Sequence, residues 1–399
     1  MVALLKVELY KHSGNALVHK YHYKPFRYQT DNNLKIIMSI ESFKRVYVCN
    51  KPYLFMIFLQ ASYGLNGLVI KCALNKGLNH FTFSVYKNAF AALFIGPFAF
   101  FLERKIRPKM TISIFLKIML LGLLGPVIDQ NLLFGGMKFT TVTFAAAMRN
   151  IVPVITFVMA LIVRLETVKM KSLHSQGKIL GTLVTVGGAM MMTLIRGPSI
   201  RFPWTNDHTL HHQTSVNTVN TQNQLKGSLM VTASCFSWAS FLIVQALTLK
   251  SYPAELSFAT LVCMIGALEG SLLVVVAERA NASVWSINWD IKLLAEIYSG
   301  ILCSGCAYYI SGVVMQDKGP VFVAVFSPLG LVFVAILGST ILAEKLNLGS
   351  VLGAVIIVFG LYLVLWGKCK DQNRQDQESP IAQQQCDRHE DSDIKTQCC

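Results

Sequence analysis

The sequence predicts an all-α polytopic membrane protein with ten transmembrane helices in two inverted five-helix repeats. Three observations lead to this fold class. A mean hydropathy of +0.48 with 14% charged residues is too apolar for a soluble chain of 399 residues. Ten apolar segments are each long enough to cross a bilayer, which takes roughly 20 residues. A glycine pattern also recurs at a fixed offset, which is typical of internal repetition.

The recurring pattern is a set of three glycines that follows a glutamate, Glu166 in one copy and Glu344 in the other. Each glycine of the second copy lies 172 residues after its counterpart (349 − 177, 353 − 181 and 360 − 188). The glycines are Gly177, Gly181 and Gly188, then Gly349, Gly353 and Gly360. Small residues let membrane helices approach closely, so we expect these glycines to lie in helix contacts.

The ten expected spans are separated mostly by short connections, so neighbouring helices are expected to be antiparallel. They cover about 52–73, 80–102, 113–135, 142–163, 177–195, 227–249, 256–277, 293–315, 320–342 and 347–367. One long connection, rich in Thr, Asn, Gln and His, separates spans five and six. A repeat with an odd number of spans inserts its second copy upside down, so the two repeats are expected to be inverted.

These spans divide the chain into five expected parts. They are a cytosolic N-terminal extension 1–50, a first repeat 51–195, an extracytosolic linker 196–226, a second repeat 227–370 and a disordered cytosolic tail 371–399. Residues 1–37 carry scattered charges and lack the apolar stretch of a signal peptide. We interpret residues 1–37 as a dispensable extension or as the product of a start site assigned too early.

Lysine and arginine residues set the expected orientation, because they concentrate in cytosolic loops. Positions 104, 105, 107 and 109 are all basic and lie between spans two and three. The loops at the opposite ends of the spans hold mostly single charges, such as Lys76 and Lys138. Both termini are therefore expected in the cytosol. The sequon at Asn281 then lies on the outer side and is a candidate glycosylation site.

Composition and missing motifs exclude other classes of function. The formal charge of +15 would suggest nucleic-acid binding in a soluble chain, but these basic residues lie between apolar spans and determine topology. The chain has no Walker loop, no G-x-S-x-G, no H-E-x-x-H and no dinucleotide glycine motif, so we expect neither an enzyme nor a cofactor. Cys303 and Cys306 lack a His or acidic partner nearby, so we expect buried thiols and no metal site.

Polar side chains inside a bilayer are costly and mark functional sites. Asp129, Gln130 and Asn131 lie late in span three, and Asn150 lies in span four. At about 1.5 Å per residue from the turn near Lys138, Asn131 and Asn150 lie at similar depths. We expect Gln130, Asn131 and Asn150 to bind a solute and Asp129 to be a candidate proton relay. The alternative is hydrogen bonding that only holds the helices together.

The second repeat carries a matching group of polar side chains. When Glu166 is aligned on Glu344, an offset of 178, Asn150 falls on Pro328, which directly follows Ser327. Pro328 lies inside a span, where it is expected to act mainly as a bend. The cavity residues expected from this repeat are Tyr308, Tyr309, Ser327 and Pro328.

Four further residues within apolar stretches are secondary candidates for binding: Lys71, Lys87, Trp238 and Gln245. The two lysines lie near the outer ends of spans one and two, where we favour snorkelling to the surface over binding of a carboxylate. Glu166 and Glu344 lie at span ends and are expected to cap or to form ion pairs. The histidines of the linker are expected to belong to a polar loop and not to a metal site.

Motifs from Lys51 onward match a known family. The matching stretches are Lys51-Pro52-Tyr53, Glu103 to Met110, Asp129-Gln130-Asn131, Thr143 to Asn150, Tyr252-Pro253, Lys318 to Phe322, Leu348 to Gly353, Gly360-Leu361-Tyr362 and Trp366-Gly367-Lys368. In this order, over about 51–370, they resemble the plant EamA-type drug/metabolite transporters. The resemblance is to the Walls-Are-Thin-related, nodulin-like group that includes the UMAMIT amino-acid facilitators. The resemblance implies ten helices in two inverted EamA repeats.

The resemblance also implies a secondary transporter or facilitator, with alternating-access or facilitated movement of small organic solutes across the plasma membrane or the tonoplast. We expect amino acids as the solute and the plasma membrane as the location, with auxin or another indole or aromatic metabolite as the alternative solute. An intramembrane enzyme or a receptor-like protein is a remote alternative. Lys87 stands where the family has Arg, which keeps the charge but not bidentate carboxylate binding. The expected partners are the solute and the lipid bilayer, with protons as a candidate coupling ion and no oligomeric state assigned.

Overall fold

The structure is a computed structural model in which the chain divides into two units, Met1–Lys51 and Pro52–Cys399. It describes residues 50–70, 73, 79–139, 145, 148–166, 173–195, 199–200, 221–277, 285, 290–341 and 346–367. The expected extension 1–37, the expected tail 371–399 and most of the expected linker lie outside these residues. The description below concerns the second unit.

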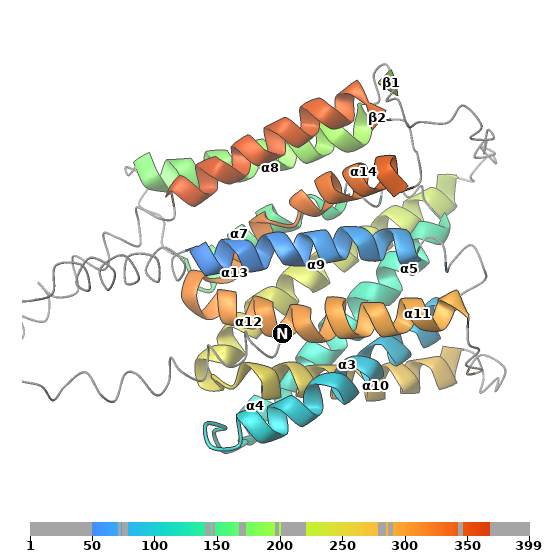
Figure 1. Cartoon of the computed structure of the whole chain (residues 1–399), viewed down its shortest axis with the longest axis vertical. Coiled ribbons are helices and arrows are strands. Elements are labelled where there is room, and N and C mark those ends of the chain that lie inside the picture. The colour runs from blue at the N-terminus through green and yellow to red at the C-terminus, as the bar shows by residue number, and fades with distance from the viewer. Residues whose placement is uncertain are drawn as a thin grey trace, which may run out of the picture. The chain divides into compact units, whose positions relative to one another are not determined.

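Nine helices in the described ranges are long and apolar enough to cross a membrane. They are Asn50–Ile70, His80–Leu102, Ile112–Met137, Gln176–Leu194, Leu225–Ser251, Glu255–Ala277, Ile291–Lys318, Pro320–Thr340 and Leu348–Gly367. The tenth expected span is represented by a short apolar helix, α7 (Val152–Ile162). These helices occupy the ten expected positions, so the all-α polytopic fold class is confirmed (Figure 1).

Several spans consist of more than one helical element. The elements are α3 (His80–Leu102), α4 (Ile112–Gly122), η1 (Leu123–Asp129), α5 (Gln130–Phe139), α7, α8 (Leu173–Leu194), α9 (Thr221–Ser251), α10 (Glu255–Ala277), α11 (Ile291–Tyr298), η3 (Ser299–Cys306), α12 (Ala307–Lys318), α13 (Pro320–Val325) and α14 (Leu329–Ile341). The helix α9 begins at Thr221, within the segment expected as linker, while its apolar part begins at Leu225.

The helical backbone is irregular at four places, which form two pairs at matching positions in the two repeats. Of these four, the sequence predicts only the interruption at Pro328. Spans three and eight each contain a π-helical segment, η1 and η3. Spans four and nine each contain a turn, at Asn150–Ile151 and at Phe326–Pro328. Pro328 therefore lies between two helices, α13 and α14, and interrupts the span as expected. Such segments leave backbone groups outside regular helical pairing, which is frequent at functional sites.

The repeated glycines pack the last span of one repeat against the last span of the other (Figure 1). A side chain at Gly181 would meet Gly360 O at 2.8 Å, and one at Gly353 would meet Gly188 O at 2.7 Å. Backbones this close leave no room for a Cβ atom, so the expectation of close helix contact is confirmed. Two short strands, β1 (Ser199–Ile200) and β2 (Leu346–Asn347), pair antiparallel at one end of this helix pair.

A second contact between the repeats runs along α3 and α10. At its end the Glu103 carboxylate accepts hydrogen bonds from the backbone N–H groups of Leu256 (2.8 Å) and Ser257 (2.7 Å). Glu103 thus satisfies donors at the start of α10, which have no partner inside their own helix. Tyr252 is buried in the turn before α10, and burial raises the pKa of its phenol above the usual value.

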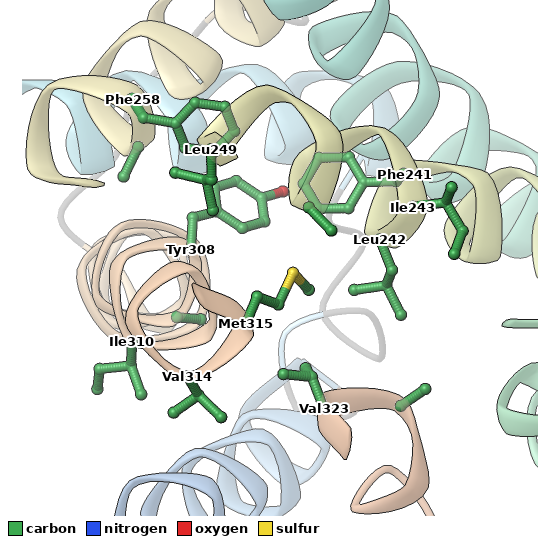
Figure 2. Close-up of a cluster of buried hydrophobic side chains, with 14 of the residues drawn as sticks. Phe241, Leu242, Ile243, Leu249, Phe258, Tyr308, Ile310, Val314, Met315 and Val323 are labelled. Atoms are coloured by element: carbon green, nitrogen blue, oxygen red, sulfur yellow. The ribbon is translucent and has the colours of Figure 1, made fainter. Parts of the chain in front are cut away.

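The spans run between two ends of the bundle, and we name each end by residues that lie there. The basic end is the end at Leu102, Ile112 and Lys318, and the far end is the end at Ile70 and His80. A cluster of buried apolar side chains fills the bundle toward the basic end (Figure 2). The Tyr308 ring points toward Phe241, with ring centroids 5.3 Å apart.

We expect Gly181→Ala to destabilise the protein by about 1–3 kcal/mol, because the new methyl group would lie 2.6 Å from Val364 N. Gly187→Ala is the matched control, since no atom lies within 4 Å of its Cβ position and alanine favours the helix. Thermal unfolding of the detergent-solubilised variants measures both. Equal melting temperatures for the two variants would contradict the tight glycine contact.

Candidate functional site

A cavity of about 410 Å³ lies among the spans of both repeats. Its size is within the range of sites for small organic ligands. Most of its polar side chains lie in or beside a π-helical segment or a turn. The lining residues are Gln60, Tyr63, Gly64, Asn66, Gly67, Ile70, Phe83, Lys87, Asp129, Gln130, Leu133, Phe134, Arg149, Asn150, Val152, Trp238, Cys303, Tyr308, Ser327, Gly330, Leu331 and Val334.

The lining residues extend from the middle of the spans to the far end. Ile70 closes its helix at the far end, and Phe83 lies three residues after His80. The lining residue nearest the basic end is Ser327, seven residues into a span that begins at Pro320, which corresponds to roughly 10 Å. Between Ser327 and the basic end lie the buried apolar residues of Figure 2. The cavity is therefore blocked toward the basic end.

An ion pair crosses the cavity wall between spans three and four. Arg149 Nη1 lies 2.6 Å from Asp129 Oδ1. Ser234 of α9 donates a hydrogen bond to the same Oδ1 (2.6 Å) and accepts one from Arg149 Nη1 (3.3 Å). Asp129 is only 3% exposed, so these two donors compensate for the loss of water around its charge.

Aromatic rings lie beside this ion pair. The Arg149 guanidinium carbon lies 5.6 Å from the centroid of the Trp238 ring, within the range of a cation–π contact. Trp238 in turn stacks on Phe241 with centroids 5.1 Å apart and an interplanar angle of 10°. The Trp238 ring therefore lies between the apolar cluster, where it stacks on Phe241, and the cavity that it lines.

Lys87 supplies a second cationic group, from α3. It is 9% exposed, lines the cavity, and its Nζ lies 5.9 Å from the centroid of the Phe83 ring. No carboxylate is its ion-pair partner among the residues that the structure describes. The side chain points into the bundle and does not snorkel to the surface, contrary to the interpretation favoured from the sequence.

Two amides from spans three and four also line the cavity. Asn150 is 4% exposed, and its Nδ2 has no hydrogen-bond partner in the described ranges of the chain. Gln130 is the first residue of α5, and its Oε1 lies 2.9 Å from the hydroxyl of Ser84. This contact orients the Gln130 amide. The Asn150 Nδ2 donor is itself buried, in a residue that lines the cavity.

The structure brings seven of the predicted residues to the cavity and places four others elsewhere. The seven are Gln130, Asn150, Tyr308, Ser327, Asp129, Lys87 and Trp238. Asn131 donates to the Val127 carbonyl (2.7 Å), and Gln245 donates to the Tyr308 carbonyl (3.3 Å). Tyr309 packs against the apolar cluster, and Pro328 lies in the turn before α14. Lys71 and Asn281 lie outside the described residues.

Sequence reasoning left out several polar lining residues, of which Arg149 is the most important. The signal for Arg149 was its place beside Asn150 in an apolar span, 20 residues after Asp129. Span one contributes the others, and its polar residues are isolated within an apolar run. They are Gln60, Tyr63 and Asn66. Asn66 accepts a hydrogen bond from Ser299 of η3, which links spans one and eight.

Other predicted features have clear outcomes. Glu166 pairs with Lys178, with 3.7 Å between Oε2 and Nζ, as expected for a glutamate at a span end. Cys303 and Cys306 are buried free thiols, as expected. Glu344 lies outside the described residues.

A bundle of two five-span repeats around a cavity that is blocked toward one end is an architecture that recurs among membrane transporters. Two matches to the model of the EamA-like transporter family, over residues 50–194 and 225–366, coincide with the two repeats. The chain belongs to this family, in its WAT1-related branch, and is a membrane transporter of small solutes.

Relatives from Arabidopsis thaliana show the branch. WAT1-related protein At2g39510 is 51% identical over 83% of this chain and 90% of its own length. WAT1-related protein At2g37460 is 51% identical over 80% of this chain and 84% of its own length. A solved crystal structure with 14% identity covers 80% of this chain and 98% of its own, with a TM-score of 0.60. This last likeness concerns the fold alone.

We expect a cysteine at Val334 to react with a charged, water-soluble methanethiosulfonate reagent, because Val334 lines the cavity toward the far end. A cysteine at Val323 should stay unreacted, because Val323 is buried in the cluster at the basic end. Both variants are compared in nanodiscs, in a Cys303→Ala background, by mass spectrometry. Faster labelling at position 323 than at 334 would contradict the assignment of the blocked end.

Proposed function

We propose that the protein is a secondary transporter or facilitator that moves small organic solutes with a carboxylate group, amino acids first among them, across a plant membrane. The movement is by alternating access of the two inverted repeats. The basis is the family, the cavity with one blocked end, and the cationic and amide groups that line it.

The observation that carries the proposal is the charge balance of the cavity. Among the described lining residues Lys87 and Arg149 are cationic and only Asp129 is anionic. Asp129 neutralises Arg149 through their ion pair, which leaves Lys87 as an excess positive charge. An uncompensated charge inside a membrane protein is costly, and a carboxylate in the cavity would compensate it.

A carrier of auxin or another indole carboxylate is the second candidate. The specific support is the flat aromatic surface of Trp238 and the rings of Phe83 and Tyr308 in the lining. Planar rings favour stacking with another ring. A solute with one negative charge and no ammonium group would also match the single excess positive charge better than a zwitterion.

The remaining functional assignments rest on the sequence. We propose the plasma membrane as the location, with the tonoplast as the alternative, both termini in the cytosol, and glycosylation at Asn281 on the outer side. In that orientation the basic end faces the cytosol. The cavity described here would then open toward the outside.

Proton coupling through Asp129 is also a proposal. Asp129 is buried in the cavity wall, where it forms an ion pair with Arg149. In this proposal the carboxylate carries the proton at a stage of the transport cycle in which the pair with Arg149 is broken.

Efflux from oocytes that express the full chain tests the proposed function directly. The cells are loaded with a labelled amino-acid mixture and with indole-3-acetate, and release is followed at two external pH values. Selective release of amino acids supports the first candidate, and release of the indole alone supports the second. No release of either solute, with protein present at the surface, would contradict both.

We expect Asn150→Ala to reduce flux severalfold at unchanged surface expression, because the cavity wall loses an amide donor that has no partner in the described ranges. The same change at Asn131 is the comparator, since its amide is bonded to the Val127 carbonyl outside the cavity. Flux is divided by the amount of surface protein for each variant. An equal loss for both variants would show that Asn150 acts only in holding the helices together.

We expect Asp129→Asn to flatten the pH dependence of flux, because asparagine cannot take up or release the proton. Asp290→Asn is the matched control, since Asp290 is exposed and its capping role at Ile291 is one that asparagine also fills. The measurement is initial flux between pH 5 and 8. An unchanged pH profile in Asp129→Asn would exclude this proton relay.

A further inference from the structure

We propose that Arg149 selects the carboxylate of the solute through the free edge of its guanidinium, and that Ser234 and Trp238 hold it in position. The inference rests on the proposed function, because it concerns how the same cavity recognises its solute. It adds a binding residue and two positioning residues from the other repeat.

The guanidinium of Arg149 is engaged on one side only. Nη1 makes both of its polar contacts, to Asp129 (2.6 Å) and to Ser234 (3.3 Å). The other donors, on Nε and Nη2, carry no hydrogen bond to any residue that the structure describes. The side chain is 29% exposed and lines the cavity, so this free edge has access to it.

A free Nε–Nη2 edge has a definite chemistry. Two parallel N–H donors match the two oxygens of a carboxylate, and such fork-to-fork pairs are stronger and more specific than single hydrogen bonds. The Asn150 amide is next along the chain, and its Nδ2 is buried without a partner in the described ranges. A carboxylate is therefore the acceptor that fits this part of the cavity.

Three groups restrict the guanidinium to one place. Asp129 and Ser234 anchor its Nη1, and they are bonded to each other at 2.6 Å. The Trp238 ring lies 5.6 Å from the guanidinium carbon and is itself stacked on Phe241. A planar cation fixed in this way loses little further freedom when it binds an anion, which favours binding.

The charges also balance when a carboxylate binds. Lys87 and Arg149 carry two positive charges, and Asp129 with one solute carboxylate carries two negative charges. A carboxamide of the same shape lacks this negative charge, so it leaves the excess positive charge in place and offers only one acceptor oxygen to the fork. The site should therefore discriminate against the carboxamide.

The arrangement joins the two repeats. Asp129 and Arg149 belong to the first repeat, whereas Ser234 and Trp238 lie on α9 at the start of the second. The free edge of Arg149 is thus held in place only while these parts of the two repeats are in contact. Ser234 and Trp238 act through Arg149 and are positioning residues.

The experiment measures the ratio of transport of a carboxylate to transport of its carboxamide. The pairs are indole-3-acetate with indole-3-acetamide and phenylalanine with phenylalaninamide, in oocytes that express the full chain. We expect Arg149→Lys to lower the ratio about tenfold for the transported pair, because lysine keeps the charge but has no fork. Arg164→Lys is the matched control, since Arg164 is exposed at the other end of the same span, outside the cavity.

The positioning role is tested separately. We expect Ser234→Ala to raise KM for the carboxylate severalfold with little change in kcat, and Ser234→Thr, which keeps a hydroxyl, to restore KM. A defect that only impaired folding would lower surface protein and leave KM and the ratio unchanged. Surface protein is therefore measured for every variant.

Each outcome either supports or overturns the proposed role of Arg149. A lowered carboxylate-to-carboxamide ratio in Arg149→Lys or a raised KM in Ser234→Ala supports it. If Arg149→Lys fails to reach the surface, the KM values of the Ser234 variants decide alone. Ratios and KM equal to those of the wild type in both variants would overturn it. Failure of the proposed function is a different result, because the unaltered chain would then transport neither member of either pair.

Discussion

A charge placed among apolar helices is costly unless an opposite charge compensates it, and the Asp129–Arg149 pair is where the protein supplies both partners itself. The pair joins span three to span four, and Ser234 joins both to span six. The walls of the cavity are therefore held together by the same groups that give the cavity its polarity. Packing and recognition cannot be separated at this site.

The inverted repeat explains why irregular backbone gathers around one point. Each repeat contributes one π-helical segment and one interrupted span, and these lie in the spans that line the cavity. A regular membrane helix satisfies all of its own backbone groups and presents only side chains. Interrupted helices present polar backbone as well, so a duplicated interruption yields two sets of such groups, facing each other from opposite directions.

The sequence was sufficient for the fold because span length and glycine spacing are local signals. It also located Asp129, Gln130 and Asn150, because polar residues are conspicuous in apolar surroundings. It could not decide which way a polar side chain points, so Asn131 and Tyr309 were expected in the cavity and lie elsewhere. The role of Arg149 depends on Ser234, which is 85 residues away, and no local pattern reports that contact.

The paired last spans, α8 and Leu348–Gly367, contribute none of the described cavity residues. Their contact is made by corresponding glycines, so each repeat offers the same face to the other, as two identical subunits do across a twofold axis. Each glycine therefore sets the space available at a position in the other repeat, so a larger side chain on either helix would separate both. The cavity wall is free of this reciprocal constraint, so its polar residues can differ between the two repeats while the contact that holds the repeats together stays the same.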